Sequence, residues 1–325
     1  MRLLVIRFSV LPMSVSSLVR VPTVTSAMLA LSVAFPIAAG QQAAPQAAAP
    51  AVAAQAPSTD EVVMVGAGDI AKCEILGGAV ATARLLDGIP GTVFTTGDNA
   101  YDDGTAEQFE KCYGPTWGRH RDRTRPSPGN HDYHTDGARP YFQYFGELAG
   151  PPGRGYYSYD LGSWHIISLD SYIATDRNSP QIQWLRADLA ANKADCIMAY
   201  WHIPLYSSGP HGGDSKVKEI WKLLYDAGAD VVVNGHDHDY ERFAPQSPDG
   251  KPDPVKGIRQ FVVGTGGGGV YKFKNPAKNS EVRDNTTYGV LKLTLGPGRY
   301  AWDFVPTQAQ GFTDSGTGVC STNGQ

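Results

Sequence analysis

Short apolar runs that end in coordinating side chains recur along this chain, and they constrain its fold more than any other feature. The runs cover residues 62–67, 92–96, 196–201 and 231–233, and polar residues follow each of them, most often after a glycine. Runs of this length predict strands. In open α/β sheets, ligand sites form beyond the carboxyl ends of the strands. We therefore expect the turns after these runs to converge on one site.

The segments between the runs favour a layered α/β fold with a single large core. We expect helices at residues 78–87, 106–113, 181–192 and 215–227, and hairpins that join 156–160 to 164–169 and 288–295 to 299–305. Alternating strands and helices are typical of layered α/β proteins. The chain has 325 residues, of which 42% are hydrophobic, so it is long enough to bury such a core.

The turns after the runs carry side chains that bind metal ions. The candidates are Asp69, Asp98, Tyr101, Asn130, His131, Asp132, His202, His236 and His238. In an extended chain His236 and His238 point the same way, because side chains alternate with a period of two. Two imidazoles suit a divalent transition metal. The alternative, a surface hairpin with two incidental histidines, does not explain the other turns. Asn130 follows a proline-rich approach rather than a clear strand.

The ordered set of motifs resembles the calcineurin-like metallophosphoesterase family. The motifs are Gly68-Asp69, Gly97-Asp98-x-x-Tyr101, Gly129-Asn130-His131-Asp132, His202 and Gly235-His236-x-His238. Tyr101, together with the Tyr-Glu-Arg sequence at 240–242, is similar to the purple acid phosphatase branch. The resemblance covers residues 62 to 305 and implies a layered β-sandwich flanked by helices, in a single catalytic domain.

The resemblance also implies a binuclear metal centre. The first metal would take Asp69, Tyr101 and His238, Asp98 would bridge, and the second metal would take Asn130, His202 and His236. Hard anionic donors favour Fe(III), whereas two imidazoles and an amide suit Fe(II), Zn(II) or Mn(II). A bound cation would hold Tyr101 as a phenolate, although the pKa of free tyrosine is about 10. The alternative for Tyr101 is a core tyrosine at a strand end.

The expected activity is hydrolysis of small phosphate monoesters by a metal-activated water or hydroxide, without a covalent enzyme intermediate. A phosphodiesterase or nucleotidase on the same centre is an alternative, because the metal ligands do not encode the second ester group. A metal- or phosphate-binding protein without turnover is another alternative, but it would require an incomplete ligand set.

Three further residues are expected to contact or position the substrate. His131 follows a ligand and should face the substrate, where it protonates the leaving group or stabilises charge, with Asp132 orienting its ring. His211 lies on a glycine-rich loop at 207–213 and is a second candidate. Members of the purple acid phosphatase branch often have two adjacent histidines there, whereas this chain has Gly212 in the second place.

Other polar segments have structural interpretations. His165 is expected to be a structural strand residue, and the basic stretch at 119–125 an ion-paired or solvated face. The glycine run at 264–269 lacks the Lys-Ser/Thr ending of a P-loop. We expect it to form a loop that rims the metal cleft.

The N-terminal region has the composition of an export signal. No charge lies between Arg20 and Gly40, and an apolar run precedes small residues at 38–40. We expect a signal peptide at 1–40, a disordered Ala/Pro/Gln-rich tether at 41–60 and the catalytic domain at 61–325. The mature protein would be secreted or periplasmic, without stable membrane association; a signal-anchor remains the alternative. The net charge of -4 gives no indication of a nucleic-acid partner. The oligomeric state cannot be inferred.

Four cysteines in an exported chain favour disulfides. Cys73 and Cys112 both lie in loops just after metal-ligand turns, so we expect them to pair across the mouth of the site. A bridge between Cys196 and Cys320 is the weaker prediction, because Cys196 opens a buried strand and is equally suited to be a core thiol. The chain has no Cys-x-x-Cys spacing, which argues against a zinc finger.

Overall fold

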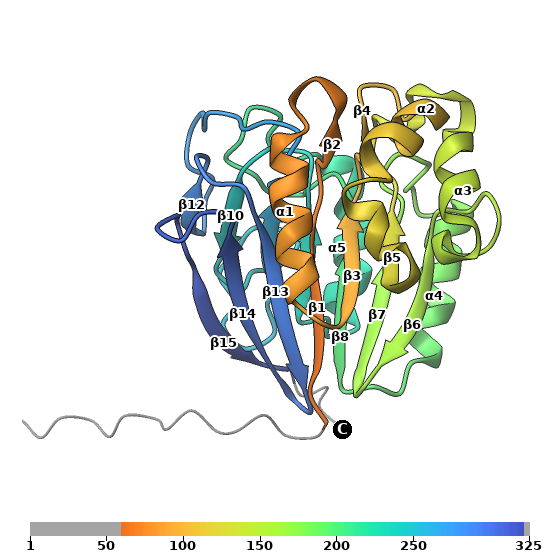
Figure 1. Cartoon of the computed structure of the whole chain (residues 1–325). Helices are drawn as coiled ribbons and strands as arrows, with labels where there is room; N and C mark the ends of the chain where they lie inside the picture. The colour runs from red at the N-terminus through yellow and green to blue at the C-terminus, as the bar shows by residue number, and fades with distance from the viewer. Residues whose placement is uncertain (1–59, 322–325) are drawn as a thin grey trace, which may run out of the picture. The chain divides into compact units, whose positions relative to one another are not determined.

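A computed structural model describes residues 60–321, which form two facing sheets with helices outside them (Figure 1). The strand order is β15-β14-β13-β1-β3-β5 in the first sheet and β12-β10-β11-β9-β8-β7-β6 in the second. The predicted α/β fold class is confirmed. The predicted signal peptide and residues 41–59 of the predicted tether lie outside the described residues. Between residues 60 and 321, none of the helices combines the length and apolar character that a membrane span requires.

The six-stranded sheet combines a parallel half with an antiparallel half. Its strands are β1 (Val62–Ala67), β3 (Thr92–Thr96), β5 (Thr124–Ser127), β13 (Gly289–Gly296), β14 (Arg299–Pro306) and β15 (Ser315–Val319). β1, β3 and β5 run parallel, and β13 joins β1 in antiparallel register, with Val65 opposite Lys292. Two short strands, β2 (Ala71–Lys72) and β4 (Ala100–Tyr101), pair beyond its carboxyl edge.

The seven-stranded sheet has a parallel centre and antiparallel edges. Its strands are β6 (Tyr157–Leu161), β7 (Trp164–Ser168), β8 (Cys196–Tyr200), β9 (Val231–Asn234), β10 (Tyr240–Phe243), β11 (Arg259–Val263) and β12 (Ser280–Asp284). β7, β8, β9 and β11 are parallel. Every residue of β7, β8 and β9 is buried. This explains why they read as continuous apolar runs rather than alternating ones, since both faces are covered.

Helices cover the outer face of each sheet. They are α1 (Gly77–Gly88), α2 (Ala106–Gln108) with the π-helical turn η2 (Phe109–Tyr113), α3 (Arg139–Phe145), α4 (Pro180–Ala191) and α5 (Lys218–Asp226), with 3-10 turns η1 (Cys73–Ile75), η3 (Trp117–Arg123), η4 (Asp132–His134), η5 (Asp136–Ala138), η6 (Gly146–Ala149) and η7 (Ser215–Val217). All four predicted helical regions and both predicted hairpins are present.

The α4 helix begins where a serine caps it. The Ser179 side chain accepts a hydrogen bond from the Ile182 amide, and Pro180 follows at the first helical position.

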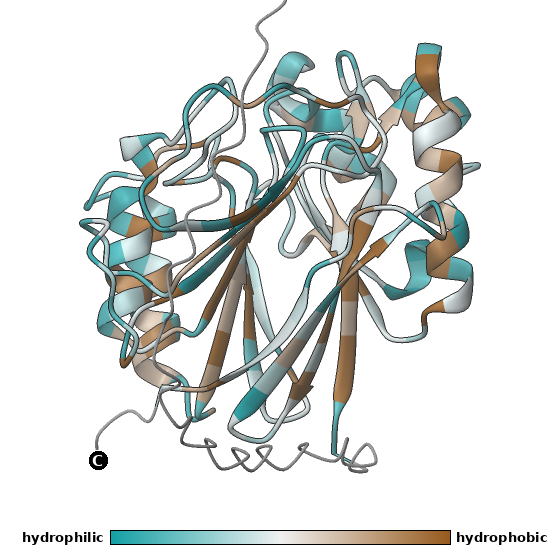
Figure 2. Cartoon of the chain, turned by 90° about the vertical axis from the view of Figure 1, so that its left-hand side faces the viewer, coloured by the Kyte–Doolittle hydropathy of each residue, from teal (hydrophilic) through white to brown (hydrophobic). Residues whose placement is uncertain are grey.

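The core lies between the sheets and under the helices. Aromatic pairs join the two inner faces: Phe94 of β3 lies 5.7 Å from Tyr200 of β8, and Phe261 of β11 lies 5.7 Å from Trp302 of β14, between ring centroids. Hydrophobic residues concentrate along the strands between the outer helices (Figure 2). This packing fixes the two sheets to one another, so loops from both can form one site.

Two disulfides tie loops to this framework. Cys73 in η1 is bonded to Cys112 in η2, which confirms the first predicted pair. Cys196 at the start of β8 is bonded to Cys320, so the alternative of a core thiol at Cys196 was wrong. Within residues 60–321 no cysteine is left free. Both bonds are typical of an oxidising compartment.

The basic stretch at 119–125 is ion-paired and structural. Arg119 forms a 2.8 Å salt bridge with Asp87 at the end of α1. Arg123 donates to the carbonyl oxygens of Leu86 (2.6 Å) and Ile89 (3.0 Å). Carbonyl groups at a helix C-terminus have no partner within the helix, so basic side chains stabilise them. The stretch therefore anchors α1.

His165 is held between two carboxylates on the face that α4 covers. Its Nδ1 lies 2.8 Å from Asp160, and its Nε2 lies 2.9 Å from Asp188. Burial disfavours the charged ring, but hydrogen bonds and charge from both carboxylates outweigh it and raise the pKa of His165. This environment agrees with the expected structural role.

We expect His165→Gln to destabilise the protein mainly at acidic pH. A raised folded-state pKa means that the stabilisation is fully present below the unfolded value of about 6.5 and is lost as pH rises through the folded value. Each kcal/mol lost lowers the melting temperature of a domain this size by about 2–4 °C. We expect the melting temperature of the variant to be lower by about 2–4 °C at pH 5.5, and by less at pH 9. The exposed His134→Gln serves as the control; an equal loss at both pH values would contradict a charged His165.

Candidate metal centre

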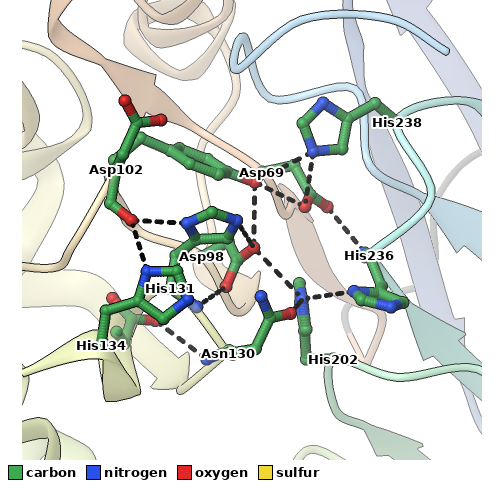
Figure 3. A network of polar contacts seen from close by, with 12 residues as sticks. Asp69, Asp98, Asp102, Asn130, His131, His134, His202, His236 and His238 are labelled. Carbon is green, nitrogen blue, oxygen red and sulfur yellow. Dashed lines mark hydrogen bonds and ion pairs between the residues drawn. The ribbon is translucent and has the colours of Figure 1, made fainter. Parts of the chain in front are cut away.

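Loops at the carboxyl ends of parallel strands in both sheets carry the predicted ligands, whose side chains converge (Figure 3). Asp69 follows β1, Asp98 follows β3, Asn130 follows β5, His202 follows β8, and His236 and His238 follow β9. The proline-rich approach to Asn130 is a strand after all. Pro126 is tolerated in β5 because this strand lies at the edge of its sheet.

Three of these residues have left-handed backbone conformations. The φ angles are 60° at Asp69, 51° at Asp98 and 76° at His236. Such conformations in residues other than glycine cost on the order of 1–3 kcal/mol and collect at functional sites. Hydrogen bonds hold them in place: the Asp69 amide donates to the Gly97 carbonyl (3.0 Å), and the His236 amide donates to Asp69 Oδ2 (2.9 Å). The strained turns thus aim the side chains at one another.

One half of the site surrounds the Tyr101 hydroxyl. It donates to Asp69 Oδ1 at 2.8 Å and lies 3.0 Å from both Asp98 Oδ2 and His238 Nε2. His238 Nε2 is itself 3.2 Å from Asp69 Oδ1. Four potential ligand atoms of hard or intermediate character therefore share this point, and all four residues are buried.

The other half surrounds His202 Nε2. This nitrogen lies 3.0 Å from Asn130 Oδ1 and 3.2 Å from His236 Nδ1. His202 Nδ1 lies 2.8 Å from the Thr96 carbonyl, which can only accept, so Nδ1 carries a proton and Nε2 is the ring atom that faces the site. The potential ligand atoms of this half therefore face a common region.

Asp98 lies between the two halves. Its Oδ2 is 3.0 Å from the Tyr101 hydroxyl and 3.3 Å from His202 Nε2. Asp69, Asp98 and His202 form a group whose ligand atoms all lie within 4.8 Å of one another. A carboxylate in this position has the geometry to contact ions in both halves.

The electrostatics favour positive charge in the site. Burial opposes ionisation, but His202 and His131 hold the pKa of Asp98 well below its usual range, and His238 lowers that of Asp69. Burial disfavours a charged His202, yet the Asp98 carboxylate raises the pKa of His202 to about 9. The carboxylates thus attract a cation, whether a proton or a metal ion. The donor set fits the binuclear centre that the resemblance implies.

Tyr101 stays protonated in the protein alone. Burial and the neighbouring carboxylates Asp69 and Asp98 raise the pKa of its phenol well above the usual value. A multivalent cation at this point would reverse that preference, because the phenolate would then neutralise charge rather than add to it. Proton release from Tyr101 would therefore accompany metal binding.

His131 lies beside the site, but its orienting partner is not the predicted one. The ring Nδ1 lies 2.5 Å from the Asp102 carbonyl oxygen, and Nε2 is 3.9 Å from Asp98 Oδ2. Asp132 is instead fully buried and accepts from the Gly129 amide (2.9 Å) and the Asn99 side chain (3.0 Å). The expectation that Asp132 orients the His131 ring was therefore wrong, because the carboxylate holds two ligand-bearing turns together.

Two nearby residues had no predicted role. Tyr271 stacks on His238 with ring centroids 3.9 Å apart and an interplanar angle of 12°. His134 lies beside His131, with centroids 4.5 Å apart, and its Nδ1 is 3.0 Å from the same Asp102 carbonyl. The η4 turn after Asn130 brings His134 to this position. Tyr271 carried no motif that could have indicated it.

Two glycine-rich loops lie beside the site: the one at 264–269, which was expected to rim it, and the one at 207–213, which carries His211. The Gly268 amide donates to the Asp69 carbonyl at 2.7 Å, and a Cβ at this position would lie 2.9 Å from the Tyr101 ring. His211, on the other loop, is exposed, and its ring centroid is 4.4 Å from that of His236. Both loops therefore contact residues of the candidate centre.

The sequence profile of the family described as calcineurin-like phosphoesterase matches residues 66–240. Purple acid phosphatase 18 of Arabidopsis thaliana is 35% identical over 158 residues, covering 46% of this chain and 36% of that protein. Purple acid phosphatase 22 of the same plant is 37% identical over 154 residues, covering 43% and 35%. The alignments thus span about a third of these relatives' length.

Solved structures share the fold at lower identity. The purple acid phosphatase PPD1 from yellow lupin (Lupinus luteus) has a TM-score of 0.69 and 18% identity, over 79% of this chain and 53% of that one. GAP50, described as the anchor in the inner membrane complex of Plasmodium, has a TM-score of 0.60 and 15% identity, over 82% and 90%. At this level the likeness concerns the fold alone.

Proposed function

The chain belongs to the calcineurin-like phosphoesterase family, and on this premise we propose that it is an exported phosphatase that hydrolyses phosphate monoesters at a binuclear metal centre. The observation that carries the proposal is the convergence of buried lone-pair donors around Tyr101 and around His202, with Asp98 between them. Buried polar atoms normally find hydrogen-bond partners. Here phenol, carboxylate, amide and imidazole atoms, all of them potential ligands, converge on two adjoining points, as expected of a metal site.

We assign all seven predicted ligands to this centre. Asp69, Tyr101 and His238 would hold the first ion, Asn130, His202 and His236 the second, and Asp98 both. The first set, with two or three anionic donors, suits Fe(III), and the second suits Fe(II), Zn(II) or Mn(II). When bound, the two ions would supply an activated water and neutralise charge on the phosphoryl group.

Side chains of the protein would position the phosphate ester and donate a proton to its leaving group. The Asp102 carbonyl fixes the proton of His131 on Nδ1, so Nε2 is the atom that faces the site. A protonated Nε2 can donate to the leaving-group oxygen or to a charged phosphoryl oxygen. His211, which is exposed and packs on His236, would contact the substrate from the opposite loop.

Export is part of the proposal. The two disulfides fit a protein that folds in an oxidising compartment. Intact-mass analysis of protein from the medium or periplasm is expected to give an N-terminus near Gln41. Retention of residues 1–40 in a membrane fraction would support the signal-anchor alternative instead.

The function is tested by metal analysis combined with turnover. We expect purified protein to bind two ions per chain and to hydrolyse monoesters faster than diesters of the same alcohol. Faster diester turnover would favour the phosphodiesterase alternative. A metal-loaded protein that hydrolyses neither class would refute the phosphatase and leave a binding protein.

Tyr101→Phe should separate a phenolate ligand from a core tyrosine. If the phenolate binds Fe(III), charge transfer from the ring colours the wild type, and Phe removes the oxygen while keeping the ring. We expect the variant to lose the visible band and bind the first ion less tightly, yet remain folded, because the change in packing is small. Tyr113→Phe, at another fully buried tyrosine, is the matched control. Wild type that is loaded with iron but colourless would exclude Tyr101 as a ligand.

A further inference from the structure

The turn that carries His236 and His238 also carries a buried acidic residue whose side chain contacts a different loop. Asp237 lies between the two histidines and is fully buried. The chain bends at His236, whose φ is 76°, and this bend directs the Asp237 carboxylate at a neighbouring loop rather than at the ligand atoms. It points into the loop at 207–212, which carries His211. A buried carboxylate requires several donors, and this loop supplies them.

Both carboxylate oxygens of Asp237 accept hydrogen bonds from that loop. Oδ1 accepts the His211 amide at 2.9 Å, and Oδ2 accepts the Gly212 amide at 3.2 Å and the Ser207 hydroxyl at 2.5 Å. A Cβ on Gly209 would lie 2.2 Å from the Asp237 carboxyl carbon, so only glycine permits this approach. Consecutive amides that surround an anion in this way form a rigid cradle.

Gly212 contributes through its backbone. Its φ of 71° lies in the left-handed region, which glycine adopts at little cost. A Cβ at this position would meet no atom within 4 Å, so strain rather than space disfavours a side chain. The left-handed turn directs the Gly212 amide at Asp237. A histidine in this place, as the resembled branch often has, would strain the cradle.

We infer that Asp237 is a positioning residue that fixes His211 over the candidate metal centre. The inference rests on the proposed function and extends it to a residue that binds no metal. The His211 backbone is held by Asp237, and its ring packs on His236 at a centroid distance of 4.4 Å. Because Asp237 adjoins both His236 and His238, one turn positions metal ligands on one face and the substrate loop on the other.

Amide hydrogen exchange tests the cradle without reference to activity. In Asp237→Asn the amide group replaces one acceptor with a donor, so we expect the His211 and Gly212 amides to exchange about tenfold faster or more, in metal-free and metal-loaded protein. Asp230→Asn is the matched control. Asp230 is 3% exposed, lies at the amino end of β9, away from the site, and accepts hydrogen bonds from the amides of Ile197 and Ser321. Unchanged exchange at His211 and Gly212 would overturn the inference.

A double-mutant cycle tests whether Asp237 acts through His211. We expect His211→Ala and Asp237→Asn each to lower kcat/KM for a monoester by about tenfold, and the double variant to lose little more, because coupled residues are not additive. Metal content should be unchanged. Additive losses, or loss of metal in Asp237→Asn, would overturn the inference.

Gly212→Ala gives an independent route if Asp237→Asn does not fold. It adds one methyl group in open space and strains only the left-handed turn, so it should reproduce the faster His211 exchange. Exchange like that of wild type in a folded Gly212→Ala would overturn the inference. If the wild type hydrolyses no ester, the proposed function fails, while the exchange measurements still decide whether Asp237 holds the loop.

Discussion

Asp98→Asn should abolish most of the activity and lower the content of both metal ions. The substitution preserves the shape of the side chain and one acceptor oxygen but removes the negative charge. His202 and His131 keep Asp98 ionised by lowering its pKa, despite burial. Since Asp98 Oδ2 lies within 3.3 Å of donors in both halves, losing its charge should weaken both ion sites. We expect turnover to fall by at least about 10³-fold, at or beyond the upper end for removing one electrostatic stabiliser.

Metal titration and kinetics on the same preparations would measure this effect. Asp230→Asn is the matched control, since it removes charge from a buried carboxylate outside the site, and it should retain both ions. Circular dichroism separates loss of metal from loss of fold. Asp98→Asn protein that keeps two ions and turns over within tenfold of wild type would show that Asp98 is not shared between them.

The convergence of the ligands could be predicted from sequence because it follows from local signals. The Gly-Asp turns at 68–69 and 97–98 end apolar runs that form β1 and β3, and parallel strands place their carboxyl ends at one edge. His236 and His238 were also predicted to share the site, but the structure brings them there through a bend, with a φ of 76° at His236, and not through an extended chain with a period of two. The sequence did not indicate how the second sheet packs on the first. Contacts between aromatic residues of the two inner faces, such as Phe94 and Tyr200, determine this packing.

The partner of His131 could not be predicted because it is a backbone carbonyl. The Asp102 oxygen reaches His131 through the turn after β4, and a carbonyl group has no side-chain identity to recognise. Asp132 was the obvious candidate because it is adjacent in sequence. Its carboxylate instead satisfies the amide of Gly129 and the side chain of Asn99. Adjacent position is therefore weak evidence for an orienting contact.

Strand β15 escaped prediction because tertiary contacts override its composition. β15 has the sequence Ser-Gly-Thr-Gly-Val, with two glycines that disfavour a strand, yet it pairs with β14. Its glycines have a reason: a Cβ on Gly316 would lie 2.3 Å from the Trp302 ring, and one on Gly318 would lie 2.2 Å from the Tyr300 ring. The Cys196–Cys320 disulfide, the weaker of the two predicted pairs, spans 124 residues and depends on this long-range pairing.

His131→Ala should retain both metal ions but lower turnover by about 10² to 10⁴, the usual contribution of a positioned acid or base. His131 Nε2 is 3.9 Å from Asp98 Oδ2, whereas the contacts between neighbouring ligand atoms are 2.8 to 3.3 Å, so we expect the ring to face the substrate rather than a metal ion. If His131 protonates the leaving group, the loss should be large for an alkyl phosphate and small for a nitrophenyl phosphate, whose leaving group needs no proton. Equal losses with the two substrates would assign His131 to stabilising charge on the phosphoryl group instead.

His134→Ala is the matched control. It removes the neighbouring ring that contacts the same Asp102 carbonyl, and it should lower turnover far less. Loss of a metal ion in His131→Ala would contradict this account, because His131 would then be a ligand itself.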